Sequence, residues 1–251
     1  LRPAVLHNKL AVYYQPLIAL ETGKVCAMEA LVRWPQEDGS LIFPDQFIPV
    51  AESSGLINQL GAFVLTEACE YCAYQHSIGN KYLSVAVNLS FSQFRDNSLP
   101  GIVKSALQKS GLPAASLELE LTESILADDH GNIRKQLEHI KQLGVQFSID
   151  DFGTGYSNLN YLRAFNAGKL KIDKIFITTL GIDQKHETLV SAIINMAKSL
   201  DMQVVAEGVE NEAAKAKLIE LGCDIGQGYL WSKPIPKHEF DVLLRAEQHI
   251  A

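Results

Sequence analysis

The side chains best suited to metal-ion chemistry come at the ends of apolar, strand-like runs of this sequence. They are carboxylates and amides, joined by one lysine, at Glu29, Asn88, Glu120, Asp150 with Asp151, Lys171, Glu207 and Gln227. From Asn88 onward these positions are 20 to 36 residues apart, about the length of one strand and one helix. Because the carboxyl ends of the strands of a barrel lie at one end of it, we expect these side chains to converge there.

Such a set of donors favours a hard cation. Carboxylate and amide oxygens without histidine or cysteine suit Mg²⁺ or Mn²⁺ and disfavour zinc. Two ions about 3.5–4 Å apart, bridged by a carboxylate, typically support the cleavage of phosphate esters by in-line attack. Lys171 would stabilise the charge of the transition state or hold the attacking water.

The stretch FSIDDFGTGYSNL, residues 147–159, places two carboxylates side by side where one run ends. Like charges repel, and neighbouring strand residues normally face opposite sides. We therefore expect cations to neutralise Asp150 and Asp151, and the following turn to bring both inward. Gly153 and Gly155 give that turn its freedom.

Plainer interpretations of two of these patterns remain open. The alternation in LELEL allows Glu118 and Glu120 to be the wet face of a half-exposed strand, and it does not decide which of them reacts. Lys171 and Asp173 share a strand face and could form a simple ion pair inside the barrel.

Eight runs with the composition of strands must position these residues. They are residues 10–18, 25–34, 83–90, 116–124, 145–151, 169–177, 202–208 and 226–231. Amphipathic helical stretches separate most of them, for example 47–75, 101–111, 131–144, 187–201 and 212–222. This alternation predicts an α/β fold, a modified (β/α)8 barrel of the TIM type, and residues 1–251 as a single domain. Only ALETGK separates the first two runs, so we expect a hairpin at Thr22-Gly23 and an antiparallel first strand.

The bulk composition narrows the class of protein. A net charge of −7 without a basic block argues against binding of DNA or RNA polymers. No apolar run approaches the roughly 18 residues that span a bilayer, and the stretch LRPAVLHNKL (1–10) lacks the apolar h-region of a signal peptide. We expect a cytoplasmic domain without membrane contact of its own, or the cytoplasmic part of a membrane-anchored sensor. Since the chain lacks a starting Met, we expect it to be a piece of a longer signalling protein.

The four cysteines offer one alternative metal site. Cys69 and Cys72 form a C-x-x-C, but they lie in a stretch of helical period and no second pair accompanies them. We therefore expect buried thiols on a helix, in a reducing compartment.

A series of sequence blocks occurs in a fixed order along the chain. They are YYQP (13–16), MEALVRW (28–34), FIPVAESSGLI (47–57), VNLS (87–90), ELTES (120–124), DDFGTGYSNL (150–159), LKIDK (170–174), VVAEGVE (204–210), GCDIGQGY (222–229) and GYLWSKPIP (228–236). In these blocks the chain resembles the EAL-domain cyclic di-GMP phosphodiesterases of bacteria, over nearly its whole length. The resemblance implies hydrolysis of one phosphodiester of cyclic di-GMP to linear pGpG, in a barrel whose first strand is antiparallel.

The resemblance also implies roles for single residues. One Mg²⁺ or Mn²⁺ ion would be held at positions matching Glu29, Asn88, Glu120 and Asp150, and Asp151 would serve a second ion. Glu120, rather than Glu118, matches the ligand. Lys171 and Glu207 match positions that orient or deprotonate the attacking water, so they join Glu29 and Asp151 as catalytic candidates. Ca²⁺ should inhibit, because its bonds to oxygen are longer and its geometry is looser than those of Mg²⁺.

Other matches concern the substrate and the loop after Asp151. Gln15, Leu31 and Arg33 match substrate contacts, and Gln227 matches a further position of the site. Glu123 and Glu210 match a pair that fixes the loop.

The departures from the family pattern are mild. Pro35-Gln36 follows RW where the family usually has His-Pro, and NAG (166–168) stands where it often has PVD. The second departure lies near the usual dimer surface, so we expect a homodimer but leave its strength open. Every metal and catalytic position is present, which favours an active phosphodiesterase over a catalytically silent cyclic di-GMP receptor or an enzyme for another phosphate ester.

Overall fold

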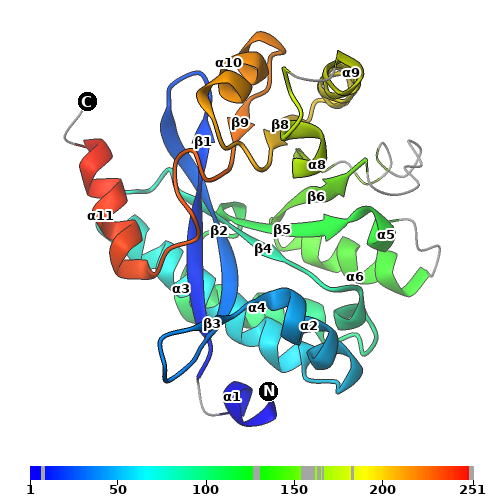
Figure 1. Ribbon diagram of the computed structural model, residues 1–251. Coiled ribbons are helices and arrows are strands. Elements are labelled where there is room, and N and C mark those ends of the chain that lie inside the picture. Colours follow the sequence, from blue (N-terminus) through cyan, green and yellow to red (C-terminus); the bar gives the residue numbers. More distant parts are fainter. Residues whose placement is uncertain are drawn as a thin grey trace.

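The strands of this protein close into a barrel. The computed structural model describes residues 1–6, 9–126, 131–153, 167–181 and 184–248, together with Leu162 and Phe165. The barrel strands are β1 (Ala11–Ala19), β2 (Lys24–Pro35), β4 (Ser84–Asn88), β5 (Leu117–Thr122), β6 (Gln146–Phe152), β7 (Lys169–Ile172), β8 (Gln203–Ala206) and β9 (Ile225–Gly226). β1 pairs with both β2 and β9, which closes the circle (Figure 1). A short extra strand, β3 (Leu41–Ile42), pairs with the end of β2.

The first strand runs against its neighbours, as the short ALETGK connection predicts. β1 is antiparallel to β2 and to β9, whereas the other barrel neighbours are parallel. The hairpin turn contains Gly23 at a φ of 70°, a left-handed conformation that glycine adopts without strain. The predicted modified (β/α)8 barrel is confirmed.

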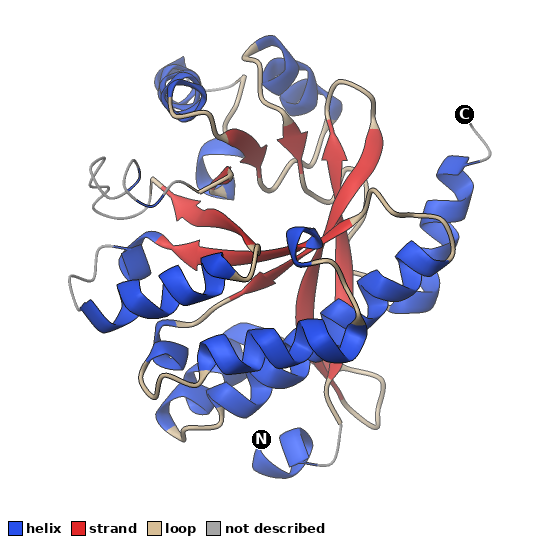
Figure 2. Ribbon diagram, turned by 180° about the vertical axis from the view of Figure 1, so that it is seen from behind, coloured by secondary structure: helices blue, strands red, loops and turns tan. Residues whose placement is uncertain are grey.

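Helices surround the barrel (Figures 1 and 2). They are α1 (Arg2–Leu6), α2 (Pro44–Ser53), α3 (Ile57–Ser77), α4 (Leu99–Ser110), α5 (Glu123–Leu126), α6 (Gly131–Gln142), α8 (Lys174–Ile177), α9 (Gln184–Ser199), α10 (Glu212–Glu220) and α11 (Lys237–Gln248), with 3-10 turns at η1 (Phe91–Phe94) and η2 (Ala114–Ser116). Within the described ranges, none of these helices is both long enough and apolar enough to cross a membrane.

Several predicted elements end earlier than expected. The predicted helix 47–75 is two helices, α2 and α3, separated by a turn in which Gly55 has a φ of 72°. The predicted strand 169–177 stops at Ile172, because the Asp173 side chain accepts a hydrogen bond from Ile175 N at 2.7 Å and caps α8. The predicted strand 226–231 also reaches only Gly226. Local capping and turns thus outweigh the strand-like composition of these ends.

Alternate residues of β5 face either the hydrophobic core or the inside of the barrel. Leu117, Leu119 and Leu121 are buried in the hydrophobic core, while the residues between them lie on the other strand face. Glu118 and Glu120 are only 5% and 1% exposed, so the interpretation of a wet, half-exposed face is wrong. These two carboxylates lie inside the barrel and therefore need partners there.

Candidate active site

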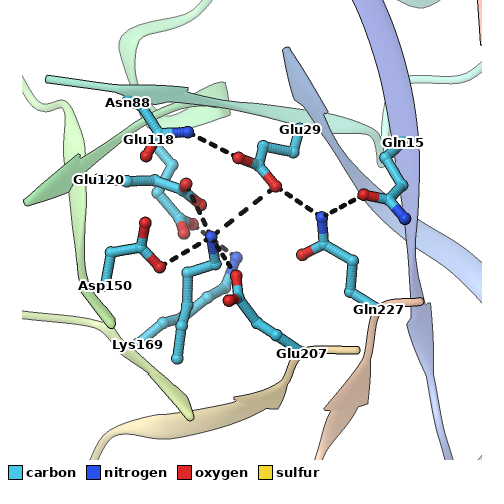
Figure 3. Close-up of polar contacts among 10 residues, drawn as sticks. Gln15, Glu29, Asn88, Glu118, Glu120, Asp150, Lys169, Glu207 and Gln227 are labelled. Atoms are coloured by element: carbon cyan, nitrogen blue, oxygen red, sulfur yellow. Dashed lines mark hydrogen bonds and ion pairs between the residues drawn. The ribbon is translucent and has the colours of Figure 1, made fainter. Parts of the chain in front are cut away.

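Four carboxylates from different strands converge on one lysine at the carboxyl end of the barrel. The Lys171 ammonium is 2.7 Å from Glu207 Oε1, 2.8 Å from Glu120 Oε2, 3.1 Å from Asp150 Oδ1 and 3.8 Å from Glu29 Oε2. Figure 3 shows these carboxyl groups pointing toward one another from the surrounding strands. The Lys171 side chain is 1% exposed, so its charge is compensated by these partners rather than by water.

Two amide side chains hold the Glu29 carboxylate from the other side. Asn88 Nδ2 donates to Glu29 Oε1 at 2.6 Å, and Gln227 Nε2 donates to Glu29 Oε2 at 2.5 Å. Gln227 Nε2 also lies 3.1 Å from Gln15 Oε1 (Figure 3). Gln15 Nε2 in turn donates to the Ser232 carbonyl at 3.0 Å. Residues expected at the metal ligands and at the substrate contacts are therefore joined in one hydrogen-bonded network.

A β-bulge places the two adjacent aspartates. The pairing of β6 with β7 shifts register between Ile149 and Phe152, so that both aspartates together stand opposite one residue of β7. Asp151 has a φ of 55°, in the left-handed region that aspartate tolerates better than most residues. Gly153 follows at a φ of 98°. The expected turn is thus centred on Asp151 itself, while Gly155 lies outside the described residues.

Burial and crowding shift the proton affinities of this cluster. Burial raises the pKa of Glu207 to about 7, and the neighbouring Lys171 opposes that shift. Burial and the adjacent Asp150 raise the pKa of Asp151 to about 6. Burial and the Glu29 charge raise the pKa of Glu120 well above its usual value. Burial alone would lower the pKa of Lys171, but the carboxylates around it outweigh that effect and raise it.

The donor set fits divalent cations better than a single ammonium. Glu120 Oε1 is buried and accepts no hydrogen bond from the described residues, whereas the buried Asp150 Oδ1 has the Lys171 ammonium at 3.1 Å. Oxygens of Asp150, Asp151 and Glu207 lie within 4.8 Å of one another, as ligands of a metal ion would. We call the following residues the upper cluster: Glu29, Glu120, Asp150, Asp151, Lys171 and Glu207. With five carboxyl groups and one ammonium it carries excess negative charge when ionised, which bound cations would neutralise.

Two other predicted residues on β2 lie next to this cluster along the strand. Leu31 and Arg33 continue the strand face that carries Glu29. Arg33 is buried, donates to the Val32 carbonyl at 2.8 Å, and has its guanidinium 5.7 Å from the centre of the Phe43 ring. Phe43, half of whose surface is exposed, was missed by the sequence reasoning because nothing in its spacing marks it.

The two predicted loop-bracing residues differ. Glu123 Oε1 accepts a hydrogen bond from Gly153 N at 2.8 Å, directly after the aspartate pair. Glu210 is exposed, and the loop that it is expected to contact, residues 154–161 above all, lies outside the described residues.

The sequence left open whether Lys171 pairs with Asp173 inside the barrel, and the structure shows that it does not. The ion pairs of Lys171 among the described residues go to the carboxylates of the upper cluster, while Asp173 caps α8.

Cys69 and Cys72 are buried free thiols of α3, and burial raises the pKa of each to about 12. The expectation of buried thiols on a helix is confirmed.

The sequence of this chain is similar to one domain family and to longer proteins that contain such a domain. Residues 1–234 match the EAL domain family. The chain is 43% identical over 241 residues to the signaling protein YkoW of Bacillus subtilis (strain 168), and 44% identical over 246 residues to the cyclic di-GMP phosphodiesterase NbdA of Pseudomonas aeruginosa. These matches cover 96% and 98% of this chain but only 30% and 31% of those proteins.

Solved structures agree in fold. The PaMucR phosphodiesterase in complex with c-di-GMP superposes with a TM-score of 0.91 and is 41% identical, covering 95% of this chain and 97% of that one. The EAL enzyme Bd1971, in its cGMP-bound form, superposes with a TM-score of 0.90 at 31% identity, over 97% of this chain and 67% of that one.

Proposed function

Since this chain belongs to the EAL domain family, we propose that it hydrolyses cyclic di-GMP to linear pGpG with the help of two divalent cations, Mg²⁺ or Mn²⁺. The observation that carries the proposal is the upper cluster, in which five carboxyl groups and Lys171 meet at the carboxyl end of the barrel. Relatives with a phosphodiesterase name and a c-di-GMP-bound structural neighbour support the choice of substrate.

The ligands of the first cation would be Glu29, Asn88, Glu120 and Asp150, and the second cation would add Asp151. When bound, the ions would neutralise the carboxylates, polarise the scissile phosphodiester and activate the attacking water. The hydrogen bonds from Asn88 and Gln227 hold the Glu29 carboxylate in a fixed orientation before any ion arrives. Preset ligands of this kind lower the cost of ordering the site.

Lys171 and Glu207 would handle the water and its proton. The Lys171 ammonium is held at the centre of the cluster, where it can donate to the water or to a phosphoryl oxygen. Glu207, whose pKa lies at about 7, is a suitable proton acceptor near neutral pH.

Substrate contacts would lie on the same side of the barrel. Gln15 and Gln227 are linked to Glu29 by hydrogen bonds, and Arg33 and Leu31 follow Glu29 on β2. Arg33 offers a cationic group to a phosphodiester that approaches the cations.

A product assay separates the three candidate functions. The protein is incubated with cyclic di-GMP and Mg²⁺, and nucleotides are separated by ion-exchange chromatography. Formation of pGpG that chelation abolishes supports the proposal. Tight binding without product would instead support the silent receptor, and turnover of other phosphate esters alone would support a different esterase. Ca²⁺ in place of Mg²⁺ should permit binding but suppress turnover.

The setting of this domain belongs to the same proposal. We expect it to work as part of a longer cytoplasmic signalling protein and to form a homodimer that tunes the loop after Asp151. Light scattering with and without cyclic di-GMP tests the dimer, and a monomer at micromolar concentration in both conditions would contradict it.

A further inference from the structure

Two parallel ion pairs cross the inside of the barrel between β5 and β7. In the upper pair, the Lys171 ammonium is 2.8 Å from Glu120 Oε2. In the second, which we call the lower pair, the Lys169 ammonium is 2.5 Å from Glu118 Oε2. Both partners of the lower pair are largely buried, with side chains 14% and 7% exposed. Figure 3 shows Glu118 and Lys169 beside the upper pair. The proposed chemistry uses only the upper pair.

The register of the strands would also allow a different partner for Glu120. Ser148 of β6 pairs in register with Glu120 on one side and with Lys169 on the other. Straight across the barrel wall, Lys169 therefore faces Glu120, with only a small side chain between them. Successive inward residues of a strand are about 6.4–6.8 Å apart, a step that a flexible lysine side chain can bridge.

Glu120 has one carboxylate oxygen to which the Lys169 ammonium could donate a hydrogen bond. Glu120 Oε1 is buried and accepts no hydrogen bond from the described residues, while Oε2 is bound by Lys171. The same oxygen is available to a divalent cation. A second ammonium at Glu120 would therefore compete directly with the metal ion.

We propose that Glu118 is a positioning residue, which engages Lys169 and so keeps that ammonium away from Glu120, leaving the Glu120 carboxylate to Lys171 and a divalent cation. The inference about turnover rests on the proposed function, whereas the inference about cation affinity does not. Lys169 also lines a hollow of about 590 Å³ at the opposite end of the barrel, with Gln203 of the neighbouring strand β8. Its side chain is nevertheless only 14% exposed, so loss of Glu118 would leave a largely buried ammonium without its carboxylate partner.

The proposal predicts an unusual pattern among variants. Glu118→Gln frees Lys169, so Mn²⁺ affinity should fall about 10- to 100-fold, as for other residues that orient metal ligands. Lys169→Gln removes the competitor and should leave Mn²⁺ affinity within about threefold of the parent protein. The double variant Glu118→Gln/Lys169→Gln should bind Mn²⁺ better than Glu118→Gln alone. It lacks both charges of the lower pair, but it also lacks the ammonium that competes with the cation.

Mn²⁺ affinity is measured by electron paramagnetic resonance, beside kcat, KM and the melting temperature. Glu187→Gln, which removes one of the two carboxylate partners of Lys217 outside the barrel, is the control and should change none of the catalytic or binding constants. If Glu118→Gln does not fold, Glu118→Asp shortens the side chain and loosens the pair, and Lys169→Gln should again restore the affinity.

Two results would overturn the inference. One is a Glu118→Gln variant that is less stable but keeps its Mn²⁺ affinity and kcat, because the pair would then only stabilise the fold. The other is a double variant that binds Mn²⁺ as weakly as Glu118→Gln does. If the parent protein does not cleave cyclic di-GMP, the proposed function fails, but the Mn²⁺ affinities still decide the role of Glu118.

Discussion

The upper cluster and the lower pair both place a glutamate of β5 against a lysine of β7, yet only the upper cluster suits cations. In the lower pair one carboxylate meets one ammonium, and the charges cancel. In the upper cluster a single ammonium is shared by several carboxylates, and the buried Glu120 Oε1 accepts no hydrogen bond from the described residues. The comparison indicates that a buried group of charged residues suits a metal ion when its carboxylates outnumber its ammonium groups. Burial alone is not sufficient.

The two ends of the barrel also differ in what their charged residues contact. The hollow at the end where the strands begin is lined by polar and apolar groups, with Glu21, Lys169 and Asp224 as its charged residues. Asp224 there accepts a hydrogen bond from Val204 N at 2.8 Å and so fixes the backbone. Chemistry in barrels of this type lies at the carboxyl ends of the strands, and residues at the other end serve stability.

The largest effect is expected from Asp151→Asn, which reduces the excess negative charge of the upper cluster. Asparagine tolerates the left-handed φ of this position as well as aspartate does, so the bulge should persist. Turnover of cyclic di-GMP should fall on the order of 10²–10³-fold, because a preset electrostatic interaction with the reacting group is lost.

Steady-state kinetics and circular dichroism of the same sample check this prediction. The control is Asp96→Asn, at an exposed aspartate outside the barrel, which should keep full activity. A folded Asp151→Asn protein with unchanged turnover would show that the second cation is not needed.

Glu123→Ala should have the next largest effect. Its carboxylate holds Gly153 N, so its loss lets the aspartate pair shift against the rest of the cluster. A displacement of about 1 Å can cost on the order of 100-fold in rate. We expect a large drop in kcat, a higher Mg²⁺ requirement and a small change in melting temperature. A modest loss of stability with normal kcat would mean that Glu123 serves only as an acidic residue at the start of α5.

In metal-free protein, the pH dependence of stability should show the cost of ionising the carboxyl groups of the upper cluster. Glu207 binds its proton more tightly in the folded state, with a pKa of about 7, than in the unfolded chain. Its contribution to stability is therefore present at low pH and is lost as the pH rises toward and through 7. Between pH 5.5 and 8 the free energy of unfolding should fall by about 2 kcal/mol.

Denaturant unfolding in the presence of a chelator measures this slope. Glu207→Gln should flatten it, and saturating Mg²⁺ should reverse it, because cations bind the ionised carboxylates. A flat profile for the metal-free parent protein would contradict the assigned charge state.

The smallest effect is expected at the other end of the barrel. Asp224→Asn weakens a charge-assisted hydrogen bond to the β8 backbone and should cost about 1 kcal/mol of stability. Turnover by the remaining folded protein should be unchanged. A loss of kcat at constant folded fraction would show that the two ends of the barrel are coupled.

Much of the upper cluster could be predicted, because each strand contributes one polar residue at its carboxyl end. Glu29 and Lys171 needed only the strand period to be found, whereas the period left Glu118 and Glu120 equivalent and the family resemblance selected Glu120. The antiparallel first strand followed from the short ALETGK turn. What the pattern could not give is register, since pairing between strands depends on the whole barrel.

Three features depend on register or on distant contacts, so residue spacing alone could not give them. The resemblance to the EAL family nevertheless singled out Glu120 as a ligand and Glu123 as a loop-bracing residue. The bulge that brings Asp151 beside Asp150 arises from the offset of β6 against β7. The choice of Glu120 over Glu118 depends on which lysine each one meets. The hydrogen bond of Glu123 to Gly153 joins residues 30 positions apart. The spacing of Lys169 and Lys171, which repeats that of Glu118 and Glu120, was the one available hint of two pairs.

Counting the Mn²⁺ ions bound per chain, in the presence of cyclic di-GMP, tests the central claim most directly. The account predicts two ions in the parent protein, one in Asp151→Asn, and two ions of lower affinity in Glu118→Gln. One ion or none in the parent protein, or a count that Asp151→Asn leaves at two, would contradict the assignment of the upper cluster as a two-cation site.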